Sequence, residues 1–163
     1  MDFAVNLNPG GINIAGGSSH DVSAYHSRGG KLLAYHGRAD QTVMSSVSSR
    51  TFQRTAETLN LTLSEMHDFY RLFYIPGMGH CSGGPGAWAI GQPTVDRPAG
   101  AQFNDTQHNI LLAMVEWVES EKAPTSLVGT KFERDQLQGG SVLAQRTLSV
   151  SYTHLTLPTN REV

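Results

Sequence analysis

Hydrophobic and polar positions follow two different periods in the first half of the chain. Short apolar runs at residues 31–36 (KLLAYH) and 70–75 (YRLFYI) are each closed at once by glycine or proline, as is typical of buried strands. Between them, apolar residues recur at helical spacing over residues 45–60, where a serine at the start can act as N-cap. The pattern predicts a β-α-β unit whose strands lie parallel in a sheet covered by helices.

The second half of the chain predicts one more helix and two short strands. The helix is expected over Asp105–Lys122, with Asn104 as its N-cap and Gln107 at the capping-box position. Strands are expected at Leu127–Phe132 and Val142–Arg146, on either side of a polar stretch that contains two glycines. The expected apolar stripe of the helix consists of Ile110, Leu111, Met114, Trp117 and Val118. The predicted fold class is therefore α/β.

Length and composition limit the size of the protein and its partners. The chain has 163 residues and is 39% hydrophobic, which fits one domain or a large piece of one. Its net charge of -2 gives no electrostatic argument for binding nucleic acid or an anionic membrane surface. No apolar run approaches the ~18 residues of a membrane span. Residues 1–20, rich in Gly, Asn and Ser, are predicted to be a poorly ordered lead-in without the features of a signal peptide.

The end of the chain differs in character from the rest. From Ser149 the sequence SVSYTHLTLPTNREV continues no pattern that precedes it. Val150–Thr159 resembles the conceptual translation of an adapter used in sequencing libraries. We therefore expect residues 149–163 to be a non-native tail and residues 21–148 to be the folded part. The alternative is a genuine β-rich C-terminus.

Two polar residues directly follow the two predicted parallel strands. Asp40 ends the segment HGRAD, and His80 stands in PGMGHC, which opens a glycine-rich loop. Because ligands of open α/β sheets bind beyond the carboxyl ends of the strands, we expect both side chains at one site. The simpler interpretations are a turn-forming aspartate and a surface histidine. Cys81, the single cysteine, is either a reduced thiol or has a partner outside this sequence.

Two other kinds of site are compatible with the same residues. His36, Asp40, His80 and Cys81 include acceptable zinc ligands, although the chain contains no close ligand pair such as HxxxH or CxxC. The chain can also be part of a non-enzymatic α/β binding module, in which Asp40 and His80 are ordinary hydrogen-bonded loop residues, since a fold alone does not fix function.

Three longer segments resemble a known family of enzymes. They are DVSAYHSRGGKLLAYHGRAD, FYRLFYIPGMGHCSGGPGA and WVESEKAPTSLVGTKF, which with the stretches between them span most of residues 21–132. In this combination the chain resembles the C-terminal part of the tannase and feruloyl esterase family of serine esterases. The resemblance implies the C-terminal part of an α/β-hydrolase fold, a Ser-His-Asp triad, and a large lid domain inserted into the hydrolase core.

The resemblance also assigns roles to individual residues. Asp40 matches the acid of the triad and His80 its base. Cys81 matches a cysteine that forms a disulfide with the residue directly before the nucleophilic serine. The chain contains no G-x-S-x-G segment, and Ser82 lies too close to His80 in the sequence to serve as the nucleophile. We therefore expect a C-terminal fragment that lacks the nucleophile and the lid, and has no esterase activity by itself.

The same resemblance suggests what the whole enzyme does. Members of the family hydrolyse feruloyl, galloyl and related aromatic esters, so the expected partner is a small aromatic ester. The site in this segment would need no cofactor, although the lid of such enzymes can hold a structural calcium ion. A disulfide suits a secreted or periplasmic protein, which is the expected localisation of the parent.

Overall fold

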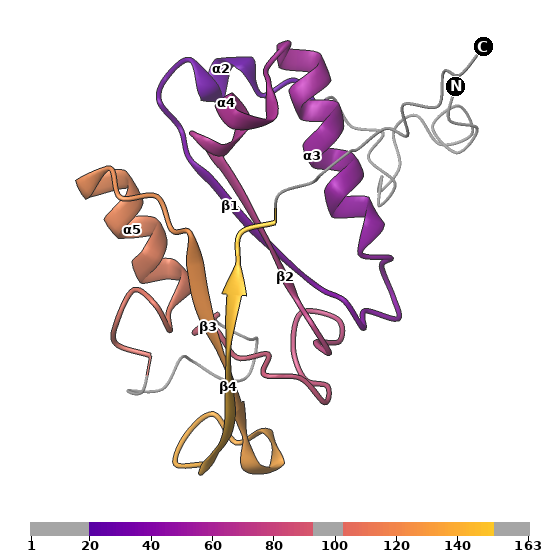
Figure 1. The fold of residues 1–163 in the computed structure, drawn as a ribbon, viewed down its shortest axis with the longest axis vertical. Coiled ribbons are helices and arrows are strands. Elements are labelled where there is room, and N and C mark those ends of the chain that lie inside the picture. Colours follow the sequence, from indigo (N-terminus) through magenta and orange to yellow (C-terminus); the bar gives the residue numbers. More distant parts are fainter. Residues whose placement is uncertain (1–19, 93–102, 152–163) are drawn as a thin grey trace, which may run out of the picture.

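The computed structural model describes residues 20–92 and 103–151, and Figure 1 shows its ribbon. Most of the predicted lead-in and most of the predicted artefact tail lie outside these residues. None of the helices in the described ranges is long and apolar enough to cross a membrane. In chain order the elements are α2 (Ser23–His26), β1 (Leu32–Gly37), α3 (Ser46–Leu59), α4 (Leu63–His67), β2 (Tyr70–Ile75), α5 (Ile110–Ser120), β3 (Ser126–Phe132), the 3₁₀ helix η1 (Glu133–Asp135) and β4 (Val142–Ser149).

The predicted β-α-β unit is confirmed. Strands β1 and β2 pair in parallel, from Leu32 opposite Tyr70 to Gly37 opposite Ile75, and α3 connects them. The sequence prediction missed α4 in the same connection. Its signal was present, because Thr62 and Glu65 form a capping box in which each side chain accepts a hydrogen bond from the backbone of the other.

Strand β2 is covered on both faces, as expected for a parallel strand in a layered α/β fold. Tyr70 and Leu72 pack with Phe52 of α3 in one apolar cluster. Phe73 and Ile75 pack in a second cluster with residues of α5 and β3. Figure 1 shows α3 and α5 on opposite sides of β2.

The prediction for helix α5 was partly wrong. The helix begins at Ile110 rather than Asp105. Its N-cap is Asn109 rather than Asn104, and the Asn109 side chain accepts hydrogen bonds from two backbone amides of the first turn. The reason is that Asp105 already caps a separate turn, accepting from the amides of Gln107 and His108. The predicted stripe is also divided: the buried side chains are Ile110, Ala113 and Trp117, whereas Leu111 and Val118 are exposed.

Strands β3 and β4 form an antiparallel pair, and β4 is longer than predicted. It continues past Arg146 to Ser149, which pairs with Ser126. Buried Val150 then forms a bridge to Phe73 of β2, and the amide of Ser151 donates to the carbonyl of Leu72 at 2.7 Å. The two sheets therefore meet at residues 149–151. That the tail is non-native stays a prediction, with residues 152–163 outside the described part.

Candidate active site

The loops that follow β1 and β2 are in direct backbone contact at the carboxyl end of the sheet. The amide of Ala39 donates to the carbonyl of Met78 at 3.0 Å, and the amide of Arg38 donates to the carbonyl of Ile75 at 2.9 Å. Gly37 permits this approach, because a Cβ atom there would collide with the carbonyl oxygens of Met78 and Gly79. The glycine that closes β1 therefore brings the two candidate loops together.

Asp40 is almost completely buried and its carboxylate is held from several directions. The side chain is 4% exposed. Its Oδ1 atom accepts hydrogen bonds from the backbone amides of Thr42 and Val43, each at 2.8 Å. Burial alone would raise the pKa of Asp40, but the hydrogen bonds from Val43, His80 and Thr42 lower it to about 2. The group is therefore a fixed, ionised carboxylate at neutral pH.

His80 contacts the second oxygen of this carboxylate. Its Nδ1 atom lies 2.9 Å from Oδ2 of Asp40, and its ring is 47% exposed. Since an ionised carboxylate only accepts, Nδ1 carries the proton, and Nε2 of the neutral ring has a free lone pair. Within the described part of the chain no group forms a hydrogen bond with Nε2. The ring can therefore take a proton from a group that approaches from solvent or from another segment.

The glycine-rich loop holds His80 through its own turns. Gly77, Gly83 and Gly84 have positive φ angles, and the amide of Gly79 donates to the carbonyl of Gly83 at 3.0 Å. Gly84 has φ 101, and a Cβ atom there would collide with the carbonyl oxygen of Gly77. Cys81 also has a positive φ, 63, which is uncommon for a residue with a side chain.

The sequence prediction missed a second set of contacts that fixes this loop. Nζ of Lys131, on β3, donates to the carbonyl of Gly84 and to Oδ1 of Asp135, both at 2.6 Å. The indole of Trp88 donates to the same Oδ1 atom at 2.7 Å. The far end of the glycine-rich loop is thus tied to β3, and no local sequence signal marks Lys131 for this contact.

A cavity of about 320 Å³ opens beside the two candidate residues. Its lining consists of Tyr35, His36, Gly37, Asp40, Val43, Met78, His80 and Cys81. Burial, followed by the nearby Cys81, raises the pKa of Tyr35. The thiol of Cys81 is free and exposed. The cavity is thus lined by two histidine rings, a tyrosine ring and an exposed thiol.

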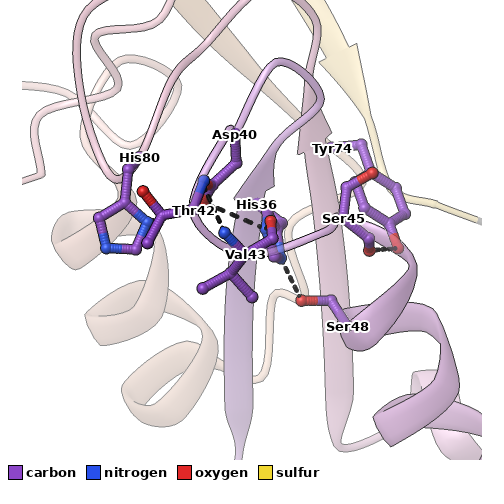
Figure 2. Close-up of polar contacts among 8 residues, drawn as sticks. All are labelled: His36, Asp40, Thr42, Val43, Ser45, Ser48, Tyr74 and His80. Carbon is purple, nitrogen blue, oxygen red and sulfur yellow. Dashed lines mark hydrogen bonds and ion pairs between the residues drawn. The ribbon is translucent and has the colours of Figure 1, made fainter. Parts of the chain in front are cut away.

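His36, one of the residues considered as a zinc ligand, also lies at this site. Its Nε2 atom lies 3.4 Å from Oδ2 of Asp40, and Figure 2 shows Asp40 between the rings of His36 and His80. Yet among residues 20–92 and 103–151 no group of three or more His, Cys, Asp or Glu side chains is arranged to hold a metal ion. Asp40 instead forms a hydrogen bond with His80, and the ring of His36 lies 3.4 Å from the same carboxylate oxygen.

Parallel strands that carry first an acid and then a histidine beyond their carboxyl ends are typical of α/β-hydrolases. Fold and site together place the described residues in the C-terminal part of an α/β-hydrolase domain. The chain belongs to the tannase and feruloyl esterase family, whose model matches residues 12–153.

Curated relatives of this family are similar over most of the chain. A probable feruloyl esterase B-2 of Aspergillus flavus is 42% identical over 137 residues, which are 84% of this chain and 26% of the relative. A probable feruloyl esterase B-2 of Aspergillus terreus is 43% identical over 112 residues, or 69% of this chain and 20% of the relative. The chain therefore spans about a quarter of the length of the curated relatives it matches.

Solved structures agree with this assignment. An esterase from Aspergillus oryzae matches with a TM-score of 0.76 and 38% identity, over 91% of this chain and 28% of that one. Feruloyl esterase B from Aspergillus oryzae matches with a TM-score of 0.72 and 39% identity, over 83% of this chain and 25% of that one. A tannin acyl hydrolase from Aspergillus niger, at 19% identity and a TM-score of 0.59, shares the fold over 90% of this chain and 24% of that one.

Proposed function

We propose that this chain supplies the acid and the base of a Ser-His-Asp triad in a carboxylic ester hydrolase that acts on aromatic esters. The observation that carries the proposal is the 2.9 Å contact between Nδ1 of His80 and Oδ2 of Asp40, with Nε2 left open beside a cavity. Feruloyl, galloyl or related aromatic esters are the proposed substrates, since the relatives described above are named feruloyl esterases.

The geometry fits the proton transfers of ester hydrolysis. Nε2 of His80 takes the proton of a serine hydroxyl as its oxygen attacks the ester carbonyl, and returns it to the departing alcohol. In the second half of the reaction the same nitrogen takes a proton from a water molecule whose oxygen attacks the acyl-serine carbonyl. It returns this proton to the serine oxygen as the bond to the acyl group breaks and the acid leaves. Asp40 keeps the proton of the neutral ring on Nδ1 and stabilises the imidazolium that forms.

The proposed nucleophile and the oxyanion hole belong to a longer polypeptide of which this chain is the C-terminal fragment. The chain has no G-x-S-x-G segment. We place the serine at the mouth of the cavity beside His80, where the exposed thiol of Cys81 can form a disulfide with a cysteine next to it. Such a bond would tie the base loop to the nucleophile loop, and it suits a secreted parent protein.

The test is hydrolysis of methyl ferulate by the longer polypeptide, recovered by extending the reading frame upstream. His80→Ala is expected to lower kcat by roughly 10⁴-fold or more, because it removes the group proposed to accept the serine proton. His108→Ala is a matched control, since His108 also bonds an aspartate, Asp105, at 2.8 Å but lies outside the cavity. A longer polypeptide without hydrolytic activity, or with equal losses in the two variants, would contradict the proposal. The isolated 163-residue chain should not exceed the buffer rate.

A further inference from the structure

His36 is the last residue of β1 before Gly37, and its ring contacts the loop that carries Asp40. The side chain is only 11% exposed. Its Nε2 atom is 3.0 Å from the carbonyl oxygen of Val43 and 3.4 Å from Oδ2 of Asp40. Its Nδ1 atom is 2.6 Å from the hydroxyl of Ser48 on α3. Both ring nitrogens of His36 therefore have hydrogen-bond partners.

The partners of His36 determine which nitrogen carries its proton. Nε2 faces the carbonyl of Val43 and the ionised carboxylate of Asp40, and both of these groups only accept hydrogen bonds. Nε2 must therefore hold the proton of the neutral ring. Nδ1 is then the acceptor for the Ser48 hydroxyl, which donates to it. Ser48 selects the tautomer that presents an N–H group to the loop.

Val43 links the ring of His36 to the carboxylate of Asp40. The amide of Val43 donates to Oδ1 of Asp40 at 2.8 Å, while the carbonyl of the same residue accepts from His36. The carboxylate is consequently held at Oδ1 by Val43, and its Oδ2 atom lies between the rings of His36 and His80 (Figure 2). Rotation of the carboxylate away from His80 would break the Oδ1 bonds and the approach to His36 together.

We propose that His36, oriented by Ser48, is a positioning residue that directs Oδ2 of Asp40 at Nδ1 of His80. This role deepens the proposed function and rests on it for its catalytic meaning, but the geometry of the pair can be tested without catalysis. A second anchor of the loop, the hydrogen bond from the Tyr74 hydroxyl to the carbonyl of Ser45 at 2.8 Å, does not touch the carboxylate. Loop anchoring and carboxylate alignment are therefore separable.

The experiment measures the tautomer of His80 in the 163-residue chain by imidazole ¹⁵N NMR at about pH 8, where ordinary histidines are neutral. An aligned carboxylate places the proton on Nδ1, whereas a histidine in water favours Nε2–H. We expect the Nδ1–H form to dominate in the wild type and to fall to a minor fraction in His36→Phe, which keeps the ring volume without a donor. His36→Gln, which can still donate an N–H to Val43, should restore most of it.

Matched variants distinguish a loss of carboxylate alignment from a general disturbance of the fold. Ser48→Ala removes the hydroxyl that orients His36 and should also lower the Nδ1–H fraction, whereas Ser49→Ala, whose hydroxyl only bonds Ser46 on the same helix, should not. Tyr74→Phe removes the loop anchor alone and should leave the tautomer unchanged. If His36→Phe does not fold, the His80 tautomers measured in Ser48→Ala and His36→Gln test the proposal instead.

The result that overturns the proposal is a His80 that keeps its Nδ1–H tautomer in folded Ser48→Ala and His36→Phe chains. An equal loss in Tyr74→Phe or in His36→Gln would overturn it too, because the effect would then come from the loop or from the ring shape. Absence of ester hydrolysis in the longer polypeptide would contradict the proposed function only, since the tautomer measurement does not depend on a nucleophile.

Discussion

Nδ1 of His80 lies 2.9 Å from Oδ2 of Asp40, although forty residues separate the two in the chain. The distance follows from the parallel pairing of β1 and β2, which ends both strands at the same edge of the sheet. Only the histidine of the pair is exposed to solvent: the Asp40 side chain is 4% exposed and the His80 side chain 47%. The carboxylate of Asp40 is thus fixed by the protein, and the ring of His80 faces the space where a further group can approach.

Replacement of Asp40 by asparagine should abolish most activity of the longer polypeptide while keeping its fold. The side-chain amide can preserve the shape, but if its oxygen stays on the amides of Thr42 and Val43, its NH₂ group faces Nδ1 of His80. That arrangement favours the tautomer with the proton on Nε2, which cannot accept the serine proton. We expect kcat to fall roughly 10⁴-fold with little change in KM, as in other triads with a misoriented histidine. A loss smaller than tenfold would show that Asp40 does not orient the base.

The low pKa of Asp40 predicts how the stability of the chain depends on pH. The folded-state pKa of about 2 lies below the ordinary aspartate value of 3.8, so the folded state favours the ionised form. Its contribution to the free energy of unfolding is complete above about pH 4 and is lost as pH falls through about 2. Urea unfolding of the wild type and of Asp40→Asn between pH 2 and pH 6 would measure this. The difference in stability between them should shrink steadily toward pH 2.

Asp105 provides the control for that measurement. Its pKa is also lowered, first by the hydrogen bond with His108, but it lies at the turn before α5 and its side chain is 51% exposed. Asp105→Asn should therefore leave the pH dependence from the Asp40 site in place. Parallel curves for the wild type and Asp40→Asn at all pH values would contradict the assignment of the buried ionised carboxylate.

The central unit of the fold was predictable because its signals are local. Apolar runs that end in glycine or proline mark β1 and β2, and a helical period marks α3 between them. Placing Asp40 and His80 after those strands required one further rule, that the carboxyl ends of parallel strands meet. These steps use neighbouring residues and topology, and no knowledge of side-chain packing.

The other parts of the site depend on contacts that sequence periodicity does not encode. His36 was considered as a metal ligand, and its actual hydrogen bonds to Ser48 and Val43 depend on where α3 and the loop before it lie relative to β1. Lys131 reaches the glycine-rich loop from a strand 47 residues away from Gly84. The start of α5 was misplaced because Asn104, the predicted N-cap, precedes a separate turn capped by Asp105. The N-cap of α5 is Asn109, and only the turn geometry shows this.

Replacement of Gly37 by alanine should separate the two loops. A Cβ atom at this position would collide with the carbonyl oxygens of Met78 and Gly79, which are backbone atoms and cannot rotate away. We expect a loss of about 1–3 kcal/mol in the free energy of unfolding, typical of overpacking, together with loss of the Nδ1–H tautomer of His80. Gly83→Ala is the comparison, because Gly83 has open space around it and only a positive φ of 68. It should cost about 1 kcal/mol and leave the tautomer intact.

Lys131→Met should loosen the glycine-rich loop without unfolding the sheet. The substitution removes the donor to the carbonyl of Gly84 and the ion pair with Asp135, both at 2.6 Å and only partly exposed to solvent. We expect a destabilisation of about 1–3 kcal/mol, as for a charged hydrogen bond lost from a partly buried site, and faster hydrogen exchange at the amides of Gly79 and Gly86, which bond within this loop. Lys122→Met is the matched control, since Lys122 is 72% exposed and pairs with Glu116 at 3.3 Å, and it should change stability by less than about 1 kcal/mol. Exchange rates in the loop that stay equal in both variants would mean that the turns of the loop, and not β3, hold His80 in place.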